Sequence, residues 1–174
     1  MLRIFVNTWG NYNMNGADGG EWFTLPMDSD ELEDALDRLS VKLGDNDPEF
    51  AIHDYEWETD INPRDIGEYD DISELNEYAE ALANLRDWEL DTYFAACELW
   101  GNDWVDLDNL DEYNLYPDID DDYDLGYYWV NESGCYDLEE MGNLANYIDY
   151  DALGRDIRFE SDGGHTSYGW IERC

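Results

Sequence analysis

The chain has 174 residues, and its 46 Asp and Glu side chains against 8 Lys and Arg leave a formal charge of −38. Charge of this sign repels phosphates and so excludes nucleic acid as a direct partner, and no apolar run approaches the ~20 residues of a membrane span. Disordered acidic tails are poor in apolar residues, whereas 43% of this chain is apolar and 16% aromatic, so we expect a folded protein.

Residues 1–60 combine strand patterns with one amphipathic helix. Alternating apolar and polar residues predict strands at residues 3–9 and 21–25, with a third at residues 49–57. A loop rich in Gly and Asn is expected between the first two, at residues 10–20. Together these elements predict a mixed β/α unit.

The helix of this unit is predicted to begin at Asp28, which can form a capping box with Glu31. Its apolar stripe recurs at helical spacing and comprises Leu32, Ala35, Leu36, Leu39 and Leu43. The acidic residues between them fall mostly on the opposite, solvent-facing side.

Residues 61–103 have a helical pattern without an apparent strand. Asp71 and Glu74 predict a second capping box, followed by an apolar stripe of Leu75, Tyr78, Ala79, Leu82 and Leu85. Another helix is predicted over residues 88–100, with inner residues Leu90, Phe94, Cys97 and Leu99. This stretch is predicted to be a small helical unit.

Residues 104–174 predict a third unit of mixed α/β structure. Its acidic block, residues 103–124, is interleaved with apolar residues, which favours a folded segment with an acidic exterior. Helices are predicted at residues 123–132, stopping near Gly134 as a glycine cap, and at residues 144–148. Residues 155–160 and 167–172 are predicted as paired strands joined by a turn at residues 162–164.

The cysteines and the first residues indicate the compartment. Cys97, Cys135 and Cys174 are far apart and include no CxxC pair, which favours a reducing environment over a disulfide framework. The first residues lack the basic and long apolar regions of a secretion signal. We therefore expect a cytoplasmic protein.

The charge favours a partner with a basic groove, so the leading hypothesis is a protein that takes the place of DNA. Duplex DNA carries one charge per ~1.7 Å of axis, so a charge of −38 corresponds to ~65 Å, or roughly 19 base pairs. A compact domain of this length has a diameter of about 40 Å. A DNA-like charge density would therefore require an elongated molecule.

No motif in the chain requires an enzyme, a metal or a cofactor, and we expect none of the three. The acids after Asp118 suggest a calcium loop, but Tyr123 stands where Gly is needed and Trp129 where Glu is needed. His53 and His165 are isolated, and the position of His53 in a predicted strand favours a structural role. Carboxylate pairs are too numerous to indicate a catalytic dyad. A halophilic or cation-binding structural protein and a carboxylate-dependent hydrolase remain as alternatives.

Several short runs, in order along nearly the whole chain, resemble one known family. They are Asn11-Tyr-Asn, Gly20-Glu-Trp-Phe-Thr-Leu-Pro26, Ala51-Ile-His-Asp-Tyr-Glu56, Ile72-Ser-Glu-Leu-Asn76, Tyr123-Asp-Leu-Gly-Tyr-Tyr128 and Asn143-Leu-Ala-Asn-Tyr-Ile-Asp-Tyr150, the last continuing to Asp156. In these runs the chain resembles the ArdA antirestriction proteins. Gly126, a poor helix former inside a predicted helix, and the heavy acidic block depart from the family pattern.

The resemblance implies an elongated α+β protein of three small consecutive units that mimics bent B-form DNA. Members of this family are carried by plasmids, conjugative transposons and phages. They occupy the DNA-binding groove of the methyltransferase and specificity subunits of Type I restriction-modification enzymes. The family forms a homodimer through its C-terminal unit, which implies a contact region here of Asn146, Tyr147, Ile148, Asp149 and Tyr150. The alternative is that Tyr147 and Ile148 complete the core of that unit.

The mechanism expected from this resemblance is distributed electrostatic mimicry. Carboxylates at phosphate-like intervals can satisfy the Lys and Arg side chains of a DNA-binding groove. Without base edges, such a mimic would act regardless of the target sequence of the enzyme. The acids expected to form this surface are Asp30, Glu33, Asp34, Asp37, Glu77, Glu80, Asp106, Asp111, Asp120, Asp121 and Asp122.

Overall fold

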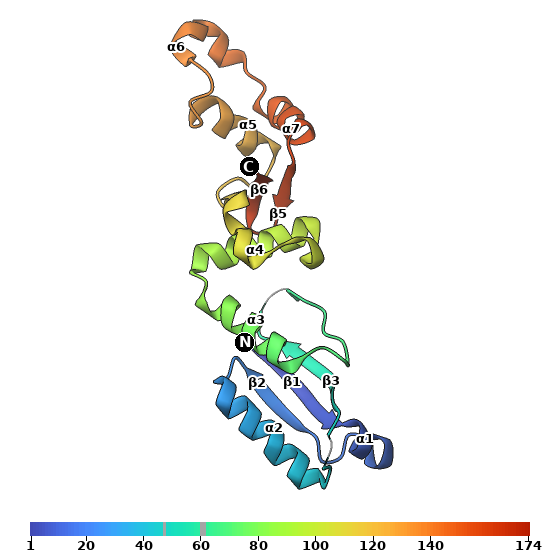
Figure 1. The fold of residues 1–174 in the computed structure, drawn as a ribbon. Helices are drawn as coiled ribbons and strands as arrows, with labels where there is room; N and C mark the ends of the chain where they lie inside the picture. Colours follow the sequence, from blue (N-terminus) through green and yellow to red (C-terminus); the bar gives the residue numbers. More distant parts are fainter. Residues whose placement is uncertain (47, 60–61) are drawn as a thin grey trace. The chain divides into compact units, whose positions relative to one another are not determined.

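A computed structural model describes residues 1–46, 48–59 and 62–174 as an α+β protein with two compact units, residues 1–85 and 86–174. Each unit contains one three-stranded antiparallel sheet and its own helices (Figure 1). The predicted boundary between residues 60 and 61 lies outside the described residues. The organisation into three consecutive units therefore stays a prediction.

The sheet of the first unit has the strand order β2-β1-β3. Strands β1 (Leu2–Thr8), β2 (Glu21–Leu25) and β3 (Phe50–Trp57) confirm the three strands expected here, each to within one residue. The side chains of Leu2, Ile4 and Val6 alternate along the central strand and are fully buried. This alternation is the reason that the strand pattern could be recognised in the sequence.

The predicted loop at residues 10–20 is wrong in its first half, where helix α1 (Trp9–Asn15) forms. Thr8 caps this helix, since its hydroxyl accepts a hydrogen bond from the Asn11 backbone N–H at 3.2 Å. The Asn11 side chain is buried and donates to the Asn7 side chain and to the Asp18 carbonyl. Side-chain amides therefore hold a segment whose composition is typical of a turn.

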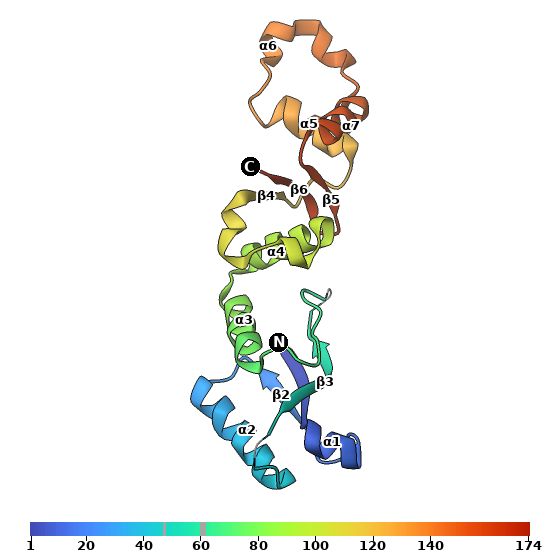
Figure 2. The same ribbon diagram turned by 45° about the vertical axis from the view of Figure 1, so that its right-hand side comes forward.

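Helices α2 (Ser29–Leu43) and α3 (Ile72–Asn84) confirm both predicted starts in the first unit. Asp28 and Asp71 each accept hydrogen bonds from two backbone N–H groups of the first turn. Both helices contribute apolar side chains to the core beneath the sheet, and Figure 2 shows α2 running along the sheet. The buried Asn76 on α3 exchanges two hydrogen bonds with the Met27 backbone, each 2.8 Å long.

Helix α4 (Asp87–Trp100) opens the second unit and is buried in its central stretch, residues 92–97. Phe94 and Cys97 are in the core as predicted, but the prediction for Leu99 is wrong, because its side chain is 36% exposed. The helix also buries Tyr93, Ala95 and Ala96. Because it packs against both β4 and β5, its apolar residues do not form a single stripe.

The second sheet has the strand order β4-β6-β5. Strand β6 (Gly169–Arg173) confirms the predicted last strand. Its partners are β4 (Tyr113–Tyr116) and β5 (Gly163–Thr166), and not the predicted strand over residues 155–160. The prediction of a strand over residues 155–160 is wrong, because these residues form the end of helix α7 (Tyr150–Glu160). Gly163 and Gly164, expected in the turn, lie in β5. A run of about six residues is too short to distinguish helix from strand by periodicity.

The remaining helices of the second unit are α5 (Asp122–Asn131), α6 (Leu138–Met141), and the 3-10 helices η1 (Asn102–Trp104), η2 (Leu107–Glu112) and η3 (Gly142–Tyr147). Helix α5 confirms the prediction for residues 123–132, but Glu132 rather than Gly134 occupies its C-cap. The predicted short helix at residues 144–148 overlaps η3. Ile119, Leu125 and Trp170 form a core beside α5.

Candidate functional site

Six of the predicted acids lie in the first unit of the structure, on two helices that share a groove. Glu33 and Asp37 on α2 and Glu77 on α3 line this groove, which has a volume of about 330 Å³. Leu36 and Phe50 contribute to its apolar lining. Asp30, Asp34 and Glu80 are exposed but are not among the groove's lining residues. The fold thus brings together carboxylates that are forty residues apart in sequence.

A second acidic cleft lies in the C-terminal unit and has a volume of about 590 Å³. Its lining includes three consecutive predicted acids, Asp120, Asp121 and Asp122, together with Asp151 at the start of α7. Asp106 and Asp111 are exposed at η2 but do not line this cleft. Asp151 was missed in the sequence because nothing in its local pattern relates α7 to the acidic block.

Asp122 differs from its two neighbours because its carboxylate binds charged or ionisable side chains, whereas the Asp121 carboxylate accepts a hydrogen bond from the Asp124 backbone N–H. Arg158 on α7 donates to both oxygens, with Nε to Oδ1 at 2.8 Å and Nη2 to Oδ2 at 3.1 Å, and His165 Nε2 lies 3.1 Å from Oδ1. The hydrogen bond from Arg158 holds the pKa of the Asp122 carboxyl below its ordinary value, with a smaller contribution from His165. Asp120 and Asp121 are exposed.

Five arginines of the chain are paired with carboxylates of the same unit and lie over aromatic rings. The ion pairs are Arg3–Glu56, Arg64–Asp70, Arg86–Glu89, Arg158–Asp122 and Arg173–Asp162. The corresponding rings are Trp22, Tyr78, Trp88, Phe159 and, for Arg173, both Trp100 and Tyr113. The positive charges of these five arginines are therefore neutralised locally. The sequence did not predict these arrangements of arginine, carboxylate and aromatic ring, because in most of them tertiary packing brings the partners together.

The predicted dimer region spans the end of η3 and the first residue of α7. Asn146, Tyr147 and Asp149 are exposed, and the Tyr147 side chain is 83% exposed, so it does not complete a core in the described chain. Ile148 is half-buried, as is Tyr150, whose ring contacts those of Tyr123 and Tyr127 on α5. The segment thus presents one large aromatic side chain to solvent beside a packed aromatic cluster.

The two histidines lie in different environments. His53 stacks on the Tyr12 ring at 3.8 Å and meets Trp9 edge-on, while His165 adjoins Asp122. Among the described residues, no group of three His, Cys, Asp or Glu side chains is arranged to hold a metal ion. Within the same residues, no helix has both the length and the apolar character needed to cross a membrane.

The sequence of the chain matches one family of known proteins over most of its length. The family model described as antirestriction protein (ArdA) matches residues 4–172, almost the whole chain. The chain belongs to the ArdA antirestriction family. A search of curated proteins finds no match. Membership of the ArdA family supports an antirestriction function and indicates a restriction-modification enzyme as its target.

Proposed function

We propose that this protein inhibits Type I restriction-modification enzymes by occupying their DNA-binding groove as a mimic of B-form DNA. The observation that carries the proposal is the match to the ArdA family over residues 4–172. The charge of −38 and the two clefts lined by carboxylates support it. The protein acts as an inhibitor and not as an enzyme.

Electrostatics supplies the mechanism of the proposed competition. A DNA-binding groove uses Lys and Arg to neutralise phosphates, and binding releases condensed ions. Exposed carboxylates of α2, α3 and the Asp120–Asp121 pair would offer the same cations alternative acceptors, which Arg can engage bidentately. Asp122 positions α7 through Arg158 and so supports the acidic cleft from within.

The partners follow from the same proposal. The mimic would bind the methyltransferase and specificity subunits, which together hold DNA, and it would inhibit enzymes of different target sequence because it presents no base edges. A homodimer would form through Asn146, Tyr147, Ile148, Asp149 and Tyr150. The exposure of Tyr147 supports this assignment, since aromatic residues are enriched in protein interfaces.

Competition with DNA tests the function directly. Labelled duplex bound to a purified Type I methyltransferase core is titrated with this protein at several salt concentrations. We expect displacement at near-stoichiometric amounts that weakens as the salt concentration rises. Absence of displacement at low salt by a protein shown to be folded would overturn the proposal. A halophilic protein would instead need molar salt to fold, so circular dichroism in ordinary buffer distinguishes that alternative.

A further inference from the structure

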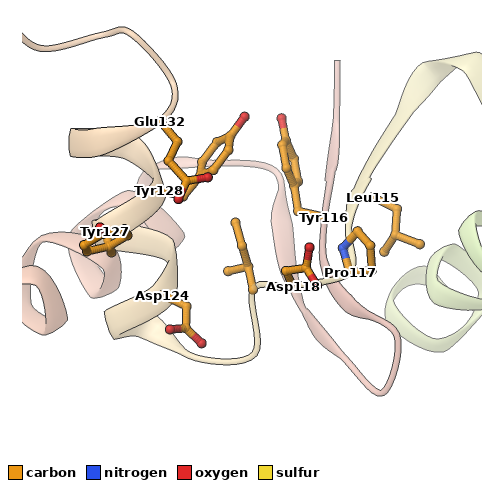
Figure 3. Close-up of a pocket in the computed structure, with 9 residues that line it drawn as sticks. Leu115, Tyr116, Pro117, Asp118, Asp124, Tyr127, Tyr128 and Glu132 are labelled. Carbon is orange, nitrogen blue, oxygen red and sulfur yellow. The ribbon is translucent and has the colours of Figure 1, made fainter.

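A separate pocket in the second unit lies between helix α5 and the segment that follows strand β4. It has a volume of about 350 Å³ and includes Tyr116, Tyr127 and Tyr128 in its lining. Figure 3 shows the Tyr116 and Tyr128 side chains side by side, with the Glu132 carboxylate next to Tyr128. The centroids of the Tyr116 and Tyr128 rings are 5.1 Å apart. The pocket therefore has an aromatic wall.

Three carboxylates belong to the same pocket: Asp118, Asp124 and Glu132. Within the described residues, no Lys, Arg or His forms an ion pair with any of them. Asp118 and Glu132 are exposed, whereas Asp124 is half-buried and accepts a weak hydrogen bond from the Asp120 backbone at 3.4 Å. The pocket thus combines aromatic rings with three negative charges and contains no compensating cation.

Tyr116 contributes its ring rather than its hydroxyl to this chemistry. The hydroxyl donates a 3.0 Å hydrogen bond to Glu172 on β6. Burial, together with the negative charge of Glu172, raises the pKa of the Tyr116 phenol far above its ordinary value, so the ring stays neutral. A neutral aromatic face beside carboxylates attracts a cation through its quadrupole.

The protein itself shows which cation fits such surroundings. Arg86 lies 4.7 Å from the Trp88 ring centroid while pairing with Glu89 at 2.7 Å. Arg3 lies 4.9 Å from the Trp22 ring centroid while pairing with Glu56 at 2.6 Å. The guanidinium group is planar, so it can stack on a ring and donate sideways to a carboxylate at the same time. The α5 pocket offers the same pair of partners without an arginine of its own.

We propose that the pocket formed by Tyr116, Tyr127, Tyr128, Asp118, Asp124 and Glu132 binds the guanidinium group of an arginine from the DNA-binding groove of the target enzyme. The source of this arginine rests on the proposed function. The pocket adds a specific contact to the distributed attraction of the acidic surface. It selects Arg over Lys, because the ammonium of Lys lacks the planar surface and the fork of donors.

The pocket is tested first with a small probe on the full chain. N-acetyl-arginine amide is titrated into the ¹⁵N-labelled protein, and N-acetyl-lysine amide is titrated in parallel. We expect saturable shifts confined to the backbone amides of residues 115, 116, 118, 119 and 124–132, with weaker binding of the lysine probe. Shifts spread evenly over the acidic surface, or equal binding of both probes, would overturn the proposal.

Two double variants of equal charge separate the pocket from the general acidity. The pocket variant is Asp118→Asn with Glu132→Gln, and the control is Asp108→Asn with Glu139→Gln, two exposed acids outside the pocket lining. We expect the pocket variant to lose the localised shifts and the control to keep them. Retention of the shifts by the pocket variant would contradict the assignment.

The same variants in the DNA-competition assay identify the source of the arginine. We expect half-displacement to require a roughly tenfold higher concentration of the pocket variant than of the control. This change corresponds to the loss of one charge-assisted, stacked contact. Equal potency of the two variants, with an active wild-type protein, would overturn the role of the pocket in inhibition. Failure of the wild-type protein to displace DNA would instead overturn the proposed function, and with it the proposal that the arginine comes from the enzyme. The NMR titration alone would then decide whether the pocket binds a guanidinium group.

Discussion

Gly126 on α5 faces Gly154 on α7 at the point where the backbones of the two helices cross. A Cβ atom on Gly154 would lie 2.8 Å from the Gly126 backbone nitrogen and even closer to the Asp122 carbonyl oxygen. A Cβ atom on Gly126 would likewise collide with the Tyr150 carbonyl. The glycine that is a poor choice for an isolated helix is therefore needed for this close packing.

Substitution Gly154→Ala is expected to destabilise the second unit by about 2–3 kcal/mol, because the backbones must separate to admit a methyl group. The free energy of unfolding can be followed in urea through the amide signals of residues 122–131. Gly67→Ala serves as the control, since its Cβ would meet only ordinary contacts at 3.4 Å or more. Equal stability of Gly154→Ala and the wild type would refute the close crossing.

Substitution Asp122→Asn is expected to destabilise the same unit by about 1–2 kcal/mol, because the charged acceptor for Arg158 and His165 is lost. Urea unfolding at neutral pH measures the change. The matched control is Asp120→Asn, an exposed neighbour whose neutralisation eases repulsion and should leave stability within about 0.5 kcal/mol of the wild type. An equal loss in both variants would argue against a specific role for Asp122.

Substitution Asn76→Ala is expected to destabilise the first unit by about 1–3 kcal/mol. The change removes both 2.8 Å hydrogen bonds to the Met27 backbone, so the N–H and carbonyl groups of Met27 lose these partners. Exchange of amide hydrogens in β2 and α3 would report the loss. Asn84→Ala, at the exposed end of the same helix, controls for the change in composition.

The stabilising effect of Glu89 should depend on pH in a defined window. The side chain and backbone N–H of Arg86 lower the Glu89 pKa from an ordinary 4.5 to about 2. This contribution is fully present above about pH 4.5 and is lost as the pH falls through about 2. The difference in unfolding free energy between wild type and Glu89→Gln should therefore shrink from pH 5 to pH 2. A difference that is constant over this range would contradict the capping interaction.

Distributed mimicry predicts that no single exposed acid is decisive for inhibition. In the DNA-competition assay, Asp34→Asn alone should weaken displacement by less than about fivefold, as for one exposed ion pair. Combined neutralisation of Asp30, Glu33, Asp34 and Asp37 should weaken it progressively. A single acid on α2 whose neutralisation abolished inhibition would rule out a distributed surface.

The local elements were largely predictable where the signal is itself local. Asp28 and Asp71 cap helices because a short side chain reaches the N–H groups of the following turn, whatever the rest of the fold does. Strand β1 could be recognised because one face is buried and the other is not. The prediction failed for residues 155–160, whose helical state depends on α7 packing against α5.

The sequence by itself determined the acidity, the aromatic content and the local caps and strands, since these follow from residue type and near neighbours. Its short runs also pointed to the family that the family match confirms. Only the tertiary structure decided that Glu33 and Glu77 share a groove, that Asp122 is held by Arg158, and that the α5 pocket lacks a cation. These relationships join residues far apart in the chain, and packing, not local propensity, sets the distances between them.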